Sequence, residues 1–502
     1  MAGKRVDAHV QQDSSPSGRS TVDQPDSGDG LLESLGYRQE FRREFTRWST
    51  LSYAISILGV LGSVPASWGA PLASGGPATA VWTWVSGSFF SLCIALSVAE
   101  LVSAYPTSGG MYITKHVFPP DKVPIAAWVI GPPGSQALHT QLLKWLVRMS
   151  RSDQLAYMRQ ILAAVSIGSA REDGTFAYAP TAEITVAVCI AVLICLGILC
   201  SFPSKRLSEM IRWFAPINLL GSLAISIALL VLTPNKLPAS EVFGHVIDGS
   251  GWNSKGFSFL IGYLSVAWIM TDYDATAHMS EELHNAAISA PVAIVQAIVV
   301  SWFFGWLLNI ALGFGAADLD GVLSSPLGNP AAQVFMNAGG RAGGLAMWFW
   351  VILVQFFTGI SAMLSDTRTC FALARDEALP FHSVWTVVIF CCLLNLIALG
   401  STQTINGIFG ITAPAMDLSY VAVIAARMYY EKEYPIQKGP FMLGRWQKPI
   451  NVTAIVWVIF ISVILFFPPT YPVTALNMNY AVAIAAFIAL FALTWWYLEA
   501  KK

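Results

Sequence analysis

Charged residues are scarce in this sequence: Asp, Glu, Lys and Arg together make up 12% of its 502 residues. Average soluble domains carry about 25%. Hydrophobic residues make up 55%, and the mean hydropathy is +0.57. A soluble core could not bury so much apolar surface, so most of it must face lipid. The shortage of charge excludes a soluble enzyme and a disordered scaffold, and the net charge of -1 argues against a nucleic-acid partner.

Cysteine is also scarce, with seven residues in the whole chain. All seven fall in or beside apolar runs, and none is paired at the spacing of metal ligands. We expect them to be small buried side chains. The pattern therefore predicts no disulfide framework, no metal site and no cofactor.

What the sequence has in quantity is long apolar runs, which predict transmembrane helices of about 20 residues each. A chain of this length has room for about twelve of them. Eleven runs are clear, with boundaries good to a few residues: 49–68, 78–103, 181–201, 211–233, 256–280, 289–313, 344–366, 384–402, 404–427, 450–467 and 477–497. We therefore expect an all-α polytopic membrane protein.

The two ends of the chain are expected to be cytosolic. Residues 1–47 contain polar clusters such as SSPSGRS and DQPDSGDG, which cannot bury enough apolar surface to fold. We expect residues 1–47 to form a disordered tail, residues 48–497 the transmembrane domain, and residues 498–502 a short C-terminus. No sorting signal separates a plasma-membrane from a vacuolar-membrane location.

The remaining span is expected within residues 123–168, whose middle is poorly suited to lipid. Residues 132–160 carry charges that are expensive at a bilayer centre: Lys144, Arg148, Arg151, Asp153 and Arg159. A crossing here nevertheless places most of the 29 Lys and Arg residues in inside loops. Two interpretations stay open. Residues 134–160 form an amphipathic interfacial or re-entrant piece, or the segment is locally wrong through a mis-spliced or frameshifted gene model.

The first apolar run is interrupted. In SYAISILGVLGSVPASWGAPL, small residues and a proline follow one another at Gly59, Gly62, Ser63 and Pro65. A broken helix is tolerated in lipid only where it faces protein or a water-filled cavity. Its freed N–H groups can bind a carboxylate, aided by the helix dipole. The alternative is a seam of small residues for close helix packing, and the motif alone does not separate the two.

A second interruption lies in FSFLIGYLSVAWIMTDYDATAHMSEEL. The apolar run reaches Trp268 and then meets Thr271, Asp272 and Asp274. Acidic groups inside a membrane are expensive unless they face a site, and an Asp beside unwound carbonyls suits an ammonium group. Alternatively, residues 270–274 mark the edge of the membrane. Two interrupted runs, one in each half, are typical of a transporter with an inverted repeat.

Four motifs carry a resemblance to a known family. They are ELVSAYPTSGGMY (100–112), MTDYDATAHMSEEL (270–283), SDTRTCFALARDEALP (365–380), and LGRWQKPIN (443–451) with FFPPTYPVTALNMNY (466–480). In this order and spacing they resemble the amino acid–polyamine–organocation permeases, most closely the fungal GABA/choline branch. The resemblance extends from about residue 31 to residue 497.

The resemblance implies twelve spans, with the first ten forming two inverted five-helix repeats, and a substrate site between the broken first and sixth spans. It implies that the Gly62 and Ser63 amides hold a substrate carboxylate, and that the sixth-span residues line the pocket. The candidate substrate-binding residues are Gly59, Gly62, Ser63, Trp268, Met270, Thr271 and Asp272.

Proton coupling is typical of such permeases, and the candidates for it are Asp272, Asp274 and Glu100. A structural hydrogen-bonding role is expected for Glu100, and Asp417 is expected to bond neighbouring helices. Some relatives have a lysine in the fifth span, where this chain has Asn218. The two histidines that flank the acidic exit, His278 and His284, are expected in solvated or loop roles.

The function expected from these features is transport, by alternating access, of a small amino acid or an amine such as GABA across a fungal membrane. Choline and polyamines remain alternative substrates. Protons are the expected coupling ion, and no enzyme activity is expected. One alternative is a nutrient sensor on the same fold that does not transport. Another is an inactive product of a faulty gene model, which residues 132–160 and the short loop at 381–383 would fit.

Overall fold

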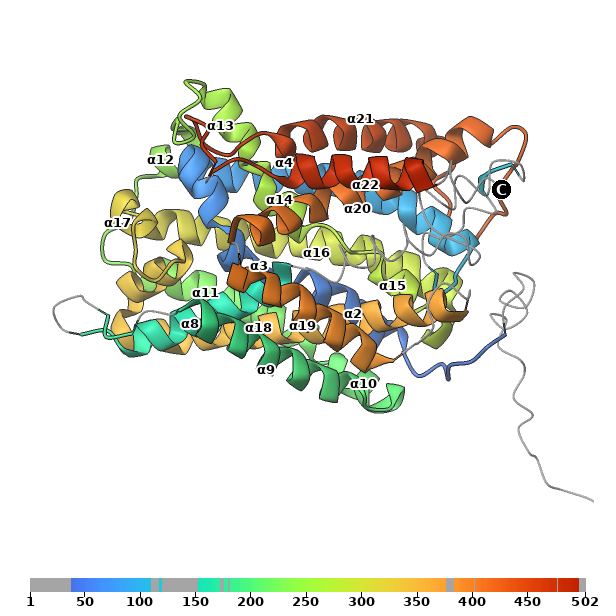
Figure 1. Cartoon of the computed structure of the whole chain (residues 1–502), viewed down its shortest axis with the longest axis horizontal. Helices are drawn as coiled ribbons and strands as arrows, with labels where there is room; N and C mark the ends of the chain where they lie inside the picture. Colours follow the sequence, from blue (N-terminus) through green and yellow to red (C-terminus); the bar gives the residue numbers. More distant parts are fainter. Residues whose placement is uncertain are drawn as a thin grey trace, which may run out of the picture.

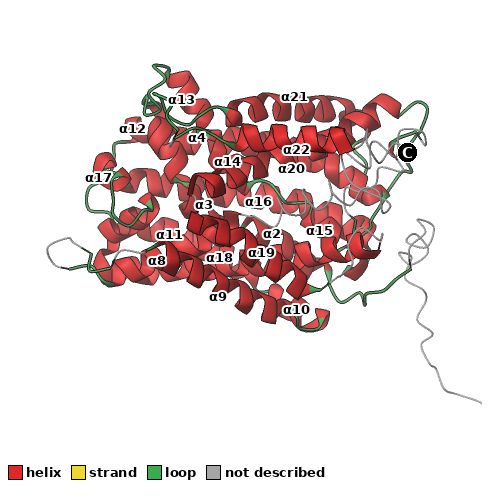
Figure 2. Cartoon of the chain, in the orientation of Figure 1, coloured by secondary structure: helices red, strands yellow, loops and turns green. Residues whose placement is uncertain are grey.

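The computed structural model describes residues 38–109, 117–119, 152–171, 176–178, 181–375, 383–400, 402–475 and 477–495. Within these ranges the chain is helical, with loops between the helices and no strand (Figure 2). The long helices lie side by side along one direction, so the bundle has two ends (Figure 1). We call them the α10 end and the α12 end, after a short helix that each carries.

The helices are α2 (Arg47–Leu58), α3 (Val60–Ser67), α4 (Gly69–Ala104), α8 (Ser152–Gly168), α9 (Ala182–Cys200), α10 (Ser204–Ile211), α11 (Phe214–Leu232), α12 (Ala239–Gly244), α13 (Lys255–Ile261), α14 (Tyr263–Ile269), α15 (Ala275–His278), α16 (Ala286–Gly315), α17 (Leu319–Leu323), α18 (Pro330–Arg375), α19 (Val384–Gly400), α20 (Thr402–Tyr430), α21 (Gln447–Phe466) and α22 (Ala481–Trp495). Two short 3₁₀ turns are η2 (Ser280–Glu282) and η3 (Gly444–Trp446).

Every one of the eleven expected spans coincides with one helix or with two or three consecutive helices. In the described part of the chain, 8 helices are long and apolar enough to cross a membrane. Shorter apolar helices lie at Lys255–Ile269, Val384–Ile397 and Ala481–Phe491. The expected fold class, an all-α polytopic membrane protein, is confirmed.

The first span is the centre of the bundle. Of the most apolar 18 residues within Arg47–Ser67, 89% are buried, against 33% for Ala182–Cys200. The outer helices instead present large apolar side chains on the surface, such as Leu220 at 67% and Val231 at 71% exposure. Because lipid is the natural solvent of such a surface, these helices form the rim around the first span.

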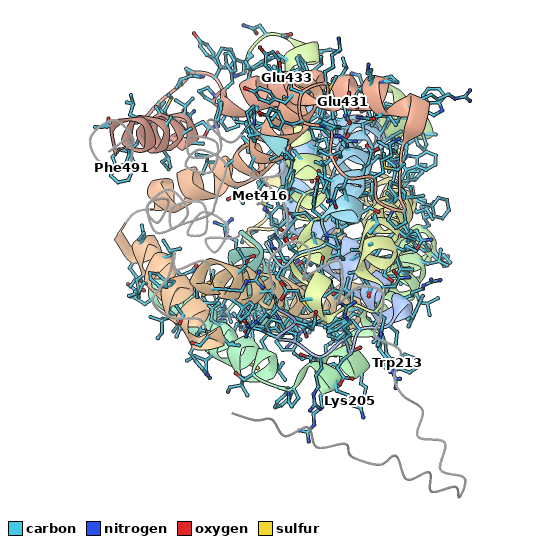
Figure 3. The ribbon with its side chains drawn as sticks, turned by 90° about the vertical axis from the view of Figure 1, so that its right-hand side faces the viewer. Lys205, Trp213, Met416, Glu431, Glu433 and Phe491 are labelled. Atoms are coloured by element: carbon cyan, nitrogen blue, oxygen red, sulfur yellow. The ribbon has the colours of Figure 1, made fainter. Side chains whose placement is uncertain are left out.

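Charged side chains gather at the ends of the bundle. Figure 3 looks at the molecule from the α10 end, with Lys205 of α10 at one edge and Glu431 and Glu433, which follow α20, at the opposite edge. Met416, in the middle of α20, lies between them in this view.

The segment expected to be atypical is helical where the structure describes it. Helix α8 takes in residues 152–160 and packs on α18, α9 and α3, with Met158 and Ile167 buried. Its Arg159 is exposed. Residues 152–160 therefore belong to the helix bundle and do not form an interfacial piece. Residues 132–151 and the short loop at 381–382 lie outside the described residues.

Candidate functional site

The first span is broken at Gly59, as expected. Helix α2 ends at Leu58 and α3 begins at Val60, and Gly59 between them has φ 47° and ψ 52°. This left-handed conformation favours glycine. A Cβ atom at Gly59 would also come within 1.9 Å of Thr358 Oγ1 on α18. Glycine is therefore needed here both for the backbone turn and for the close approach of α18.

The amides freed by this break have partners inside the chain. The N–H groups of Gly62 and Ser63 both donate to the Gly59 carbonyl, at 2.9 and 2.7 Å. The N–H of Leu61 donates to Asn218 Oδ1 of α11, at 3.1 Å. To bind here, a substrate carboxylate would have to replace the Gly59 carbonyl as the acceptor of the Gly62 and Ser63 N–H groups. The carboxylate role of Gly62 and Ser63 stays a prediction.

Side-chain amides surround the break. Asn218 also donates to the Ile55 carbonyl of α2, at 3.5 Å, so it links the two halves of the broken span. Gln160 of α8 donates to the Gly62 carbonyl at 2.7 Å. Gln355 of α18 lies so close to Gly62 that a Cβ there would be 2.6 Å from its Oε1. Gln160 was not among the expected site residues, although a polar side chain at the start of the apolar run ILAAVSIGS marks it.

The second break is buried inside the protein. Helix α14 ends at Ile269 and α15 begins at Ala275. The loop between them contains Asp272 in a left-handed conformation, φ 61°, which is uncommon for a residue other than glycine. Met270, Thr271 and Asp272 are 1%, 7% and 6% exposed. Burial of this degree favours an interior break over a membrane edge.

The two interrupted spans are in contact. Ser67 Oγ of α3 lies 2.7 Å from Ser265 Oγ of α14, which is a hydrogen bond between the broken spans. Both helices are labelled in the middle of the bundle in Figure 1. Trp268 of α14 is half-buried. The structure thus brings the candidates from the two interrupted runs to neighbouring helices.

Asp274 sits in a network of buried polar groups. Tyr420 of α20 donates its hydroxyl proton to Asp274 Oδ1 at 2.6 Å. His278 Nε2 lies 3.5 Å from Asp274 Oδ2, and its Nδ1 lies 2.9 Å from the Ser108 carbonyl. Because a carbonyl only accepts, Nδ1 carries a proton.

The expectation of a solvated or loop role is wrong for His278, which is 1% exposed. Its ring lies between Asp274 and the Ser108 carbonyl, and these partners compensate for the loss of water. His284 is exposed, as expected.

Three acidic side chains lie on the elements around Tyr273. Asp272 and Asp274 are the sequence neighbours of this buried residue, and its ring lies 5.5 Å from that of Tyr420 on α20, the helix that also carries Asp417. Asp417 is on α20 and is 7% exposed. A cluster of acids around the second break is what a cation site or a proton site requires.

Glu100 lies apart from both breaks, in an ion pair. Arg427 Nη1 donates to Glu100 Oε2 at 2.7 Å, and the Leu443 N–H donates to the other oxygen at 3.3 Å. Glu100 and Arg427 are 0% and 3% exposed. The pair connects α4 to α20 near the α10 end.

A second group of ion pairs follows the sixth span. Arg375 Nη1 lies 2.9 Å from Glu281 Oε1, and Arg368 pairs with Glu282. The Ser108 N–H also donates to Glu281, at 3.1 Å. Both glutamates are 1% exposed. The Glu-Glu motif that was part of the family resemblance therefore joins the exit of the sixth span to α18.

Comparison with known proteins gives close relatives. An uncharacterised amino-acid permease of Schizosaccharomyces pombe is 42% identical over 494 residues, which cover 95% of this chain and 89% of that protein. Amino-acid permease 2 of Neurospora crassa is 34% identical over 505 residues, 97% of this chain and 90% of its own. An amino-acid permease of Arabidopsis thaliana is 29% identical, with 96% of each chain covered.

Two solved structures share the fold. A manganese transporter of Eremococcus coleocola, in a mutant form, matches with a TM-score of 0.56 over 89% of this chain and 93% of its own. MhsT in complex with L-phenylalanine matches with the same TM-score, 0.56, over 83% of this chain and 97% of its own. Each is 12% identical to this chain, so these likenesses concern the fold alone.

The family model described as amino acid permease matches residues 45–490, nearly the whole helical bundle. This match agrees with the relatives at 42% and 34% identity. The chain is a multi-pass membrane protein that belongs to the amino acid permease family, a family of transporters and not of enzymes.

Proposed function

We propose that this chain moves small amino acids or amino-acid-like amines such as GABA across a membrane by alternating access. The substrate binds between the α2/α3 break and the α14/α15 break. One observation carries the proposal: the two interrupted spans pack on each other, α3 on α14 through the Ser67–Ser265 hydrogen bond and α2 on α15, and the loop between α14 and α15 holds the buried carboxylates Asp272 and Asp274. Transporters bind their substrates at interrupted membrane helices of this kind, where the unwound backbone lies inside the helix bundle.

The choice of substrate class rests on the charge of the site. Asp272 and its acidic neighbours favour a cationic group, such as the ammonium of an amino acid. The relatives from Neurospora crassa and Arabidopsis thaliana are named amino-acid permeases, and MhsT was solved with L-phenylalanine. The motif resemblance to the GABA/choline branch favours small, unbranched amines. Candidate contacts are Trp268, Met270, Thr271 and Asp272, with Gly59, Gly62 and Ser63 on the other side.

We propose protons as the coupling ion, taken up at the second break. Asp274 is the favoured carrier, because it accepts a hydrogen bond from the Tyr420 hydroxyl and the His278 ring lies beside its other oxygen. Glu100 is less suited, since both of its oxygens already have partners, the Arg427 guanidinium and the Leu443 N–H. The proposed orientation places the α10 end and both termini in the cytosol of a fungal cell, under the plasma or vacuolar membrane.

Uptake measurements test the function directly. Radiolabelled GABA, proline, choline and putrescine are offered to a permease-deficient yeast that expresses the full chain. We expect uptake of GABA or proline, and we expect Asp272→Asn to abolish it while a fluorescent fusion still reaches the membrane. Asp320→Asn, an exposed aspartate of α17, is the matched control and keeps wild-type uptake. Unchanged uptake kinetics in Asp272→Asn would contradict the proposed role of Asp272 in substrate binding.

A further inference from the structure

Gln160 stands at the point where α8 meets the broken first span. Its side chain is 0% exposed, and its Nε2 donates to the Gly62 carbonyl at 2.7 Å. The backbone carbonyl of Gln160 accepts a hydrogen bond from Trp348 Nε1 of α18 at 2.9 Å. Backbone and side chain of Gln160 are thus both fixed, and its amide is oriented by the Gly62 contact.

The side-chain oxygen of Gln160, Oε1, is buried and has no hydrogen-bond partner within the described residues. A buried acceptor without a donor is unfavourable, and native proteins retain few of them. An unpartnered acceptor beside a helix break therefore indicates a ligand that brings a donor.

The remaining hydrogen-bonding groups at the break agree with this. The N–H groups of Leu61, Gly62 and Ser63 all have acceptors within the chain. These three N–H groups are therefore occupied, whereas the acceptor Gln160 Oε1 is available. In this conformation it suits the ammonium end of a substrate better than the carboxylate end.

We infer that Gln160 is a substrate-binding residue whose Oε1 accepts a hydrogen bond from the amino group of the substrate. The inference rests on the proposed function and adds a contact from the third span to a site otherwise built from the first and sixth. The ligand class is an amino acid or amine with at least one N–H donor. A compound of the same shape without the amine leaves Oε1 unpaired, which is how a buried polar group discriminates between substrates.

The test separates amine recognition from general affinity. The purified full chain in proteoliposomes takes up radiolabelled GABA or L-alanine. Uptake is competed by unlabelled amino acid and by the matching acid without an amine, butyrate or propionate. The ratio of the two inhibition constants measures how strongly the site depends on the amino group.

Three variants divide the possibilities. Gln160→Met removes both ends of the amide at similar size, and Gln160→Glu keeps an acceptor oxygen but changes the contact to Gly62. Gln296→Met makes the same Gln-to-Met change on an exposed position of α16 and serves as the control. Thermal unfolding of each variant in detergent checks that it is folded.

We expect Gln160→Met to raise the KM of the amine probe by about tenfold or more, with little change in the inhibition constant of butyrate or propionate. Gln160→Glu keeps most of the affinity for the amine, and Gln296→Met behaves like wild type. Equal losses for amine and acid in both Gln160 variants would mean that Gln160 only supports Gly62, and would overturn the inference. No uptake of either probe by the wild-type chain would overturn the proposed function as well.

Discussion

The two aspartates of the second break lie two residues apart but differ in their surroundings. Asp272 occupies a left-handed backbone conformation, so its position depends on contacts that hold the loop. Asp274 instead accepts a hydrogen bond from Tyr420 and faces His278. The first environment suits contact with a substrate, and the second suits the handling of a proton. At the scale of single residues, this difference is why we propose separate tasks for the two acids.

This division predicts the behaviour of Asp274→Asn. An asparagine keeps the size of the side chain and an oxygen for Tyr420, but it cannot bind and release a proton. We expect the variant to lose accumulation of substrate driven by a pH gradient. Exchange of labelled for unlabelled substrate across the same membrane should persist, because exchange moves no net proton. Both are measured in proteoliposomes with an imposed pH gradient.

Asp320→Asn is again the matched control, since this exposed aspartate lies outside the site. Proton-driven accumulation that survives in Asp274→Asn would contradict the role in coupling. If the variant loses both exchange and accumulation, Asp274 is part of the substrate site instead.

At the scale of elements, the interruptions were predictable and their partners were not. Glycine, proline and acidic residues inside an apolar run are local signals, and the two breaks fall where those signals lie. The contact of Gln160 with Gly62 spans 98 residues, and that of Glu281 with Arg375 spans 94. Local patterns do not encode which distant helix arrives at a break. His278 was misjudged for the same reason, because its burial comes from Asp274 and the distant Ser108.

The ion pair between α4 and α20 carries a prediction of its own. Glu100 and Arg427 are both buried, so removing one partner leaves an unpaired charge away from water. Breaking such a pair destabilises a protein by about 3–5 kcal/mol. We expect Arg427→Met to lower the unfolding temperature in detergent strongly, and Arg427→Met with Glu100→Gln to recover part of the loss. Additive effects of the two substitutions would contradict a direct pairing.

At the scale of the whole molecule, the segment 38–46 closes the α10 end. It was expected to belong to a disordered tail, but Phe45 is 1% exposed. The Phe45 N–H donates to the Glu282 carbonyl at 3.0 Å, and its carbonyl accepts from the His284 N–H at 3.1 Å. Gln39 Nε2 donates to the Glu281 carbonyl at 2.6 Å. The chain ahead of the first span is thereby attached to the exit of the sixth span.

The same closure includes α18. The Arg368 guanidinium lies over the Phe41 ring at 4.7 Å, and Phe41 contacts Phe371 edge to face with ring centroids 4.7 Å apart. Arg368 and Arg375 hold the two glutamates of the sixth-span exit. Under the alternating access that we propose, each end opens in turn, and we expect these contacts to break when the α10 end opens.

Cys370 reports on that opening, since it lies on α18 between the two arginines and is 0% exposed. In a chain whose other cysteines are replaced by serine, we expect maleimide to label Cys370 slowly. Phe45→Ala removes a buried side chain of the segment 38–46, and Arg375→Gln removes the ion pair with Glu281. We expect the double variant to populate the open form more, so that Cys370 is labelled faster. Lys236→Gln, an exposed change in the loop between α11 and α12, leaves the rate unchanged. If the double variant is labelled no faster while it still unfolds cooperatively, the segment 38–46 is not what keeps this end shut.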